Sequence, residues 1–126
     1  SKYVNKKYRR SRSEEVYDYC KQIVESPYIK SMVYDKYRDV YYRFIYPGID
    51  TKPNDDIMLI YNVFRVFSVM VLDKDFNVIG ETLMPEKTYN PNMYFINEDG
   101  LWISTNNPEN PNFEEDAINF DLFTLK

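Results

Sequence analysis

From residue 28 onward, apolar and polar residues alternate with the period of two that is typical of β strands. The segment 40–46 is the clearest case, and both of its sides are largely apolar, so we expect both to be covered. One side consists of Val40, Tyr42, Phe44 and Tyr46, and the other of Tyr41, Arg43 and Ile45. Segments of this kind predict seven strands, at residues 29–35, 38–46, 67–72, 77–84, 93–97, 101–105 and 117–125.

Helical periodicity is clear only in residues 13–25, where four apolar residues recur on one face, namely Val16, Cys20, Ile23 and Val24. Ser13 is expected to be the N-cap, and Glu14 is favourable in the first turn of a helix. Pro27 ends the helix, because the residue before a proline is biased toward extended backbone.

Residues 57–72 are mostly apolar, and a run of this kind can be a buried strand or a buried helix. Its β-branched and aromatic residues favour a strand. We therefore predict extended structure here, with the helical alternative left open for residues 57–65.

Three of the predicted hairpins are similar to one another in sequence. Residues 32–41 align without gaps with residues 70–79, and residues 94–103 are a version with a turn one residue shorter. Each has Asp or Asn at the start of its turn, where the side chain can accept hydrogen bonds from backbone N–H groups two residues on. Asn77 and Gly100 are expected to close their turns in the left-handed conformation.

Repeated antiparallel hairpins are typical of β-propellers, in which each blade is a four-stranded sheet. The sequence therefore predicts an all-β fold of antiparallel hairpin repeats of the β-propeller blade type, with about seven strands and one N-terminal helix. Residues 28–84 would form one complete four-stranded blade, and residues 93–126 an incomplete three-stranded one. Together with the helix they would make a single domain over residues 13–126. The edge without a fourth strand would pair with the helix region, with another copy or with a further part of a longer protein.

The composition excludes several classes of site. The chain has no His, which removes the commonest general base and every His-ligated metal site. Cys20 is the only cysteine, so there is no internal disulfide and no CxxC cluster. On the apolar helix face it is expected to be a buried small hydrophobe rather than a nucleophile. We predict no catalytic residue and no cofactor.

The charge is unevenly distributed along a chain whose formal net charge is −4. Six basic residues stand within residues 1–12, before the first acidic residue, Glu14. A basic segment with tyrosines between its charges can bind nucleic acid, but a solvated tail or loop is favoured over that alternative. No run reaches the ~20 apolar residues that span a bilayer, and the first residues lack the pattern of a signal peptide.

A metal site is also not expected. Residues 73–77 begin like a calcium loop, with carboxylate or amide side chains at alternate positions. However, Val78 stands where such a loop needs Gly, and Met84 stands where it needs Glu, so a hairpin turn is favoured. The acidic residues at 114–116 are better explained as a solvated loop.

The strand aromatics supply the candidate ligand-binding residues. Tyr41, Arg43, Tyr61 and Trp102 are the best placed to stack on sugar rings or to hold an anionic ligand, because aromatic faces and guanidinium groups suit these contacts. Packing between sheets is the more ordinary role of such residues, and we favour it.

A resemblance to a known family lies in the strand sequences of residues 26–28, 33–44, 67–73, 78–81, 100–106 and 120–125. These sequences resemble the carboxy-terminal part of a family of Bacteroides-type cell-envelope lipoproteins, a domain of unknown function with TolB-like, six-bladed propeller character. The resemblance covers residues 13–126, and no assigned catalytic residue comes with it.

The resemblance implies an exported, lipid-anchored parent protein. We therefore expect a non-catalytic binding or protein-interaction module at the cell envelope, with carbohydrate or another envelope protein as partner and no nucleic acid. Membrane contact would come only through the lipid anchor of the parent, and a homo-oligomer through the unpaired edge strand is a further possibility. The alternative is a fragment of a carboxylate-dependent glycan hydrolase or lyase, since twenty acidic residues offer many carboxylate pairs.

Overall fold

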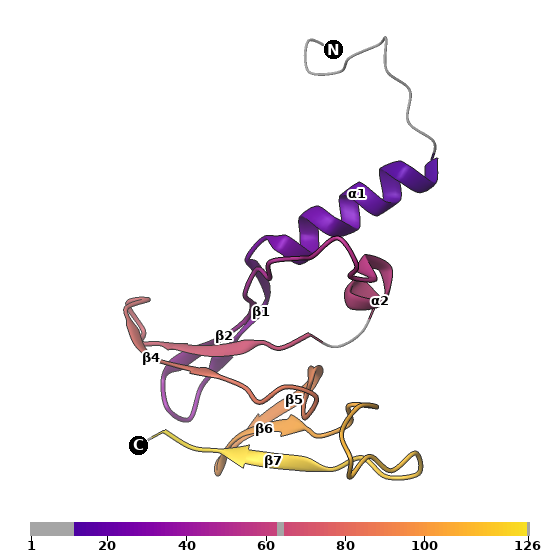
Figure 1. The fold of residues 1–126 in the computed structure, drawn as a ribbon. Coiled ribbons are helices and arrows are strands. Elements are labelled where there is room, and N and C mark those ends of the chain that lie inside the picture. The colour runs from indigo at the N-terminus through magenta and orange to yellow at the C-terminus, as the bar shows by residue number, and fades with distance from the viewer. Residues whose placement is uncertain (1–11, 63–64, 126) are drawn as a thin grey trace.

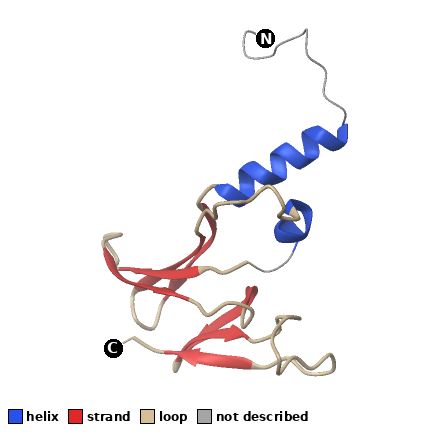
Figure 2. Cartoon of the chain, in the orientation of Figure 1, coloured by secondary structure: helices blue, strands red, loops and turns tan. Residues whose placement is uncertain are grey.

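The computed structural model describes residues 12–62 and 65–125, which form two antiparallel sheets and two helices (Figures 1 and 2). The four-stranded sheet has the order β1-β2-β3-β4, and the three-stranded sheet has the order β5-β6-β7. This confirms the predicted all-β class, and the two sheets are consistent with partial propeller blades. The strands are β1 (Tyr28–Asp35), β2 (Val40–Tyr46), β3 (Ser68–Leu72), β4 (Val78–Leu83), β5 (Asn90–Asn97), β6 (Gly100–Ser104) and β7 (Phe120–Phe123).

The hydrophobic core lies between the two sheets, and alternation along the strands explains it. The side of β2 that carries Tyr42 and Phe44 is buried, whereas the side that carries Tyr41 is only half-buried. Leu101 and Ile103 of β6 supply the facing side. The ring of Phe44 stacks on that of Tyr94 in β5, with 4.6 Å between the ring centroids. The expected burial of both sides of β2 is therefore complete on one side and partial on the other.

Helix α1 (Arg12–Glu25) contacts the short helix α2 (Ile57–Asn62) and lies at one end of the four-stranded sheet (Figure 1). Cys20 and Val24 of the predicted apolar face are buried, whereas Val16 on that face is 42% exposed. The helix begins at Arg12, one residue before the expected N-cap, so Ser13 lies inside its first turn and that expectation is wrong. The chain after β2 satisfies the other end, because the Ile49 N–H donates to the Val24 carbonyl, 3.2 Å away.

Residues 57–65 contain a helix, α2 (Ile57–Asn62), and the prediction of extended structure there is wrong. Asp56 explains the helix: its side chain accepts a hydrogen bond from the Leu59 N–H at 3.1 Å, and its carbonyl accepts one from the Ile60 N–H. Ile57 is buried, while Leu59 and Tyr61 are exposed. A start signal of this kind, one residue before the apolar run, outweighs the β-branched composition of the run itself.

The turn residues confirm one expectation and correct another. Each hairpin turn begins with Asp35, Asp73 or Asn97, and each of these side chains accepts a hydrogen bond from the backbone N–H two residues later. In the second hairpin, however, Phe76 has the positive φ, of 64°, rather than Asn77. Asn77 instead donates its backbone and side-chain N–H groups back to Asp73.

Two further expectations concern the two ends of the chain. The predicted basic tail or loop of residues 1–12 lies outside the described residues, apart from Arg12. The last strand is shorter than expected, because only Phe120–Phe123 of the alternating segment 117–125 pair as strand. No helix among the described residues is long and apolar enough to cross a membrane.

Candidate functional site

The four residues expected to bind a ligand lie in three separate places. Tyr41 and Arg43 lie together on the side of β2 that faces away from the core. Tyr61 is exposed on α2, and Trp102 lies on the outer side of β6 in the other sheet. The structure therefore brings Tyr41 and Arg43 together but joins neither Tyr61 nor Trp102 to them.

Tyr41 is the centre of an aromatic cluster that also contains Tyr34 and Phe76. The Tyr41 ring centroid lies 5.0 Å from that of Tyr34 and 4.8 Å from that of Phe76. These separations are those of favourable aromatic pairs. Tyr34 is 47% exposed and Phe76 is 54% exposed, so the cluster presents ring faces and edges to the outside.

Local structure explains how the three rings meet. Tyr34 and Tyr41 stand directly opposite each other in the β1–β2 pairing, where facing side chains come into contact. The positive φ of Phe76 turns the tip of the β3–β4 hairpin so that its ring reaches Tyr41. The Tyr34 hydroxyl donates to the Asp39 carboxylate at 2.7 Å, and this hydrogen bond raises the pKa of Tyr34.

Arg43 extends the same surface along β2. It stands opposite Met32 on β1 and Met70 on β3, two residues from Tyr41 and on the same side of the sheet. Arg43 and Met70 are half-buried, and Met32 is exposed. The outer face of the four-stranded sheet thus combines aromatic rings, one guanidinium group and flexible thioether side chains.

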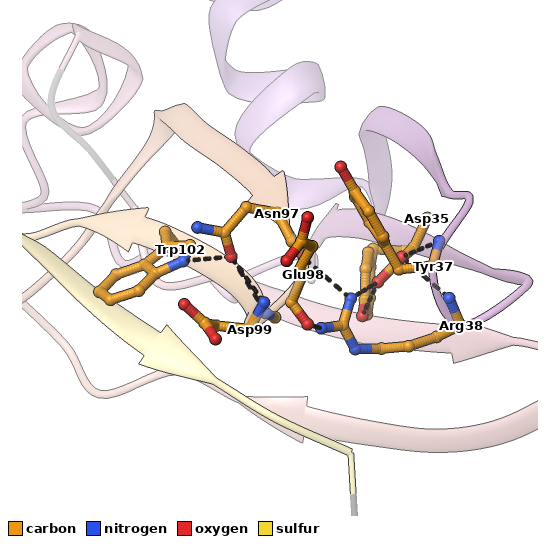
Figure 3. A network of polar contacts seen from close by, with 9 residues as sticks. Asp35, Tyr37, Arg38, Asn97, Glu98, Asp99 and Trp102 are labelled. Carbon is orange, nitrogen blue, oxygen red and sulfur yellow. Dashed lines mark hydrogen bonds and ion pairs between the residues drawn. The ribbon is translucent and has the colours of Figure 1, made fainter.

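A polar network joins the β1–β2 turn to the β5–β6 turn at the edge of the core (Figure 3). The Asp35 carboxylate is fully buried, and it accepts hydrogen bonds from the Arg38 guanidinium and the Tyr42 hydroxyl, each at 2.7 Å. Arg38 also donates to the carbonyls of Asn97 at 3.2 Å and Glu98 at 2.6 Å. One guanidinium group therefore connects the two sheets.

The hydrogen bonds of this network shift the pKa values of Asp35 and Tyr42. Burial alone opposes ionisation of Asp35, but the hydrogen bonds from Tyr42, Arg38 and two backbone N–H groups outweigh it, so the pKa of Asp35 is lowered. Burial, together with the hydrogen bond to Asp35, raises the pKa of Tyr42. Both oxygens of the Asp35 carboxylate thus accept hydrogen bonds within the fold, as is typical of a structural group.

Trp102 belongs to the second half of the network rather than to an open binding surface. The Asn97 side-chain oxygen accepts the Trp102 indole N–H at 2.9 Å, together with the backbone N–H groups of Asp99 and Gly100. The Trp102 ring stacks on Phe95, with 5.8 Å between centroids, and Phe95 meets Phe120 edge-on. These three rings form a second aromatic group on the outer side of the three-stranded sheet.

The described residues offer no obvious place for a metal ion. Among residues 12–62 and 65–125, no group of three or more Cys, Asp or Glu side chains converges as ligands would. The Asp73 carboxylate, which begins the segment that resembles a calcium loop, is occupied by Asp75 and Asn77 of its own turn. The arrangement of the outer faces suits binding by stacking and hydrogen bonding.

Sequence reasoning missed Tyr34 and Phe76 as members of the aromatic cluster. Tyr34 could have been found, because the hairpin alignment with its four-residue turn places residue 34 opposite residue 41. Phe76 could not, because its position depends on which turn residue takes the positive φ.

Comparisons with known proteins agree on one family. A family model described as "Domain of unknown function (DUF4221)" matches residues 1–83. A crystal structure of a DUF4221 family member from Bacteroides vulgatus is 37% identical, with a TM-score of 0.69. The match covers 88% of this chain but only 32% of that chain, so this sequence spans about a third of the length of that relative. A comparison with curated proteins finds no match.

Proposed function

Since this chain belongs to the DUF4221 family, a domain family of unknown function, we propose that it is a non-catalytic binding or protein-interaction module of a cell-envelope β-propeller protein. The exposed aromatic cluster of Tyr34, Tyr41 and Phe76, with Arg43 beside it, is the observation that carries the proposal. Large rings left exposed on a sheet face mark a surface that gains free energy when it is covered.

The size of the family's chains supports the propeller part of the proposal. Two sheets account for 32% of the length of the Bacteroides vulgatus chain, so sheets of this size would number about six over the whole chain. That lies within the usual four to eight blades of a propeller.

The cell-envelope part of the proposal rests on the likeness of the strands to exported, lipid-anchored proteins. A lipid anchor on the parent protein would be its contact with the membrane. Carbohydrate is the partner that the aromatic cluster suits best, because sugar rings stack on aromatic faces while an arginine donates to hydroxyl or carboxylate oxygens. Another envelope protein is the second partner class.

We expect the exchange Tyr34→Ala to weaken glycan binding by about two- to tenfold, since an aromatic contact contributes roughly 0.5–1.5 kcal/mol. Phe76→Asn should have a similar effect and keep the turn, because Asn tolerates a positive φ. A glycan array identifies the best ligand for the unaltered chain, and isothermal titration calorimetry then compares the variants.

Phe95→Ala is the matched control. Phe95 is also an exposed aromatic residue on an outer sheet face, but it belongs to the second sheet, so its loss should leave the affinity unchanged. Equal losses for Tyr34→Ala and Phe95→Ala would contradict the assignment to the aromatic cluster. Release of free sugar from any glycan on the array would contradict the non-catalytic role and favour the hydrolase or lyase alternative.

A further inference from the structure

We propose that a hollow between three strand connections, here called the loop hollow, binds a free α-amino acid with an apolar side chain. It is separate from the aromatic cluster, and the inference does not depend on the proposed function. The hollow has a volume of about 200 Å³ and lies among the β2–β3, β4–β5 and β6–β7 connections. Its described lining residues all lie well inside the two ends of the sequence, and they are Ile49, Arg65, Val66, Glu86, Lys87 and Glu109.

The Nη1 atom of Arg65 is a buried donor that lacks an acceptor. The guanidinium carbon lies 4.3 Å from the centroid of the Tyr46 ring, which is a cation–π contact. Among the described residues, Nη1 has no hydrogen-bond partner. A buried donor without an acceptor is unfavourable, and the planar guanidinium group suits the two oxygens of a carboxylate. A carboxylate in the loop hollow would therefore satisfy Arg65.

The charges around the loop hollow are balanced. Arg65 and Lys87 are cationic, and Glu86 and Glu109 are anionic. In the part of the chain that the structure describes, no ion pair joins any of these four side chains to another. The two glutamates would repel a simple anion, and the two cations would repel a simple cation. A molecule with both a carboxylate and an ammonium group matches both pairs of charges.

The size and the apolar part of the lining narrow the ligand further. A water molecule takes up about 30 Å³, and pockets for drug-sized ligands have about 300–1,000 Å³. The loop hollow therefore holds several waters or one small molecule. Ile49 and Val66 supply apolar surface beside the charges. An α-amino acid with an apolar side chain combines these three kinds of contact in one small molecule.

The walls of the loop hollow are held in place by the fold. Asn107 is only 2% exposed, and its side chain joins two of the connections. Its oxygen accepts the Glu109 N–H at 3.0 Å, and its Nδ2 donates to the Tyr89 carbonyl at 3.2 Å. Lys87 has a φ of 57°, a conformation that is uncommon outside glycine and that often occurs at ligand-binding sites. A preformed wall lowers the cost of binding, because little has to be ordered.

NMR titration of the full chain tests the ligand class. L-leucine, L-valine and L-phenylalanine are added separately, and at least one should bind with a dissociation constant below about 1 mM. No saturable binding of any of the three up to about 10 mM overturns the proposal.

Three analogues of the amino acid that binds best test the need for both charges. One lacks the ammonium group, one lacks the carboxylate, and the third is the N-acetyl amide, which represents a residue within a polypeptide. Each should bind at least tenfold more weakly. If an analogue binds as well as the amino acid, the proposal is wrong, and in the case of the N-acetyl amide the hollow accepts a polypeptide segment instead.

Variants assign the two charges to their partners. Arg65→Met keeps an unbranched side chain beside Tyr46, and it should remove the preference for the amino acid over the analogue without a carboxylate. Glu86→Gln combined with Glu109→Gln should remove the preference over the analogue without an ammonium group. Both glutamates are exposed, so this double variant should fold normally. Circular dichroism and thermal melting check the fold of each variant.

Lys30→Met is the matched control. The Lys30 Nζ lies 6.0 Å from the centroid of the same Tyr46 ring, but Lys30 is not among the described lining residues of the loop hollow. Its loss should leave the affinity for the amino acid unchanged. Unchanged affinity in a folded Arg65→Met variant, or an equal loss in Lys30→Met, would show that Arg65 does not bind the carboxylate and would refute the site.

Discussion

Replacing Arg38 by Met is expected to lower the free energy of unfolding by about 3–5 kcal/mol, the usual cost of breaking a buried ion pair from one side. The Asp35 carboxylate is fully buried and the Arg38 side chain is only 18% exposed, so the ion pair is largely shielded from water. The substitution also removes the bonds from Arg38 to the Asn97 and Glu98 carbonyls, which connect the sheets. Chemical denaturation, followed by the fluorescence of the single Trp, measures the loss.

The pH dependence of this loss follows from the lowered pKa of Asp35. A carboxyl group whose pKa is lower in the folded state stabilises the fold above its unfolded pKa of about 3.9. That stability is lost as the pH falls through the folded pKa. In Arg38→Met the carboxylate has lost its main partner, so its protonation in acid relieves the destabilisation. The difference between the two proteins should therefore be largest near neutral pH and should shrink below about pH 4.

Lys21→Met is the matched control for this prediction. Lys21 forms an ion pair with Glu25 at 3.8 Å, and both side chains are more than 40% exposed. Exposed pairs of this kind contribute at most about 1 kcal/mol, so the control should lose little at any pH. If Arg38→Met and Lys21→Met lowered the free energy of unfolding equally, the buried pair of Asp35 and Arg38 would stabilise the fold no more than an exposed ion pair does.

The hairpins could be predicted from the sequence because their determinants are local. Alternation gives the strands, and the Asp or Asn at the start of each turn bonds to backbone only two to four residues away. The start of α2 also has a local determinant, because the Asp56 side chain accepts a hydrogen bond from the Leu59 N–H. The β-branched and aromatic composition of the apolar run favours a strand instead, so the prediction that rests on composition alone is wrong there.

The contacts that join the sheets could not be predicted in this way. Arg38 and its acceptor Glu98 are 60 residues apart, and nothing near Arg38 in the sequence indicates which carbonyl it will reach. The same holds for the aromatic cluster, where the ring of Phe76 reaches Tyr41 from the tip of a different hairpin. Candidate residues were therefore recognised by type, and their grouping required the three-dimensional structure.

Replacing Gly100 by Ala is expected to destabilise the fold by about 2–4 kcal/mol, through backbone strain and crowding together. Gly100 begins β6 with φ of 154°, a conformation that residues with a Cβ atom rarely adopt. A Cβ atom there would lie 2.5 Å from the Phe123 carbonyl oxygen and 2.8 Å from a methyl carbon of Leu122. Relief requires β7 to move away from β6, which weakens the pairing at that edge. Thermal and chemical unfolding measure the effect.

Gly80→Ala makes the same chemical change at a site without these constraints. No heavy atom lies within 4 Å of a Cβ placed at Gly80, and the backbone there has an ordinary negative φ. Alanine restricts the unfolded chain more than glycine does, so this control should be neutral or stabilising by up to about 1 kcal/mol. Equal stability of the two variants would show that β6 and β7 are not held as closely as the contacts of Gly100 require.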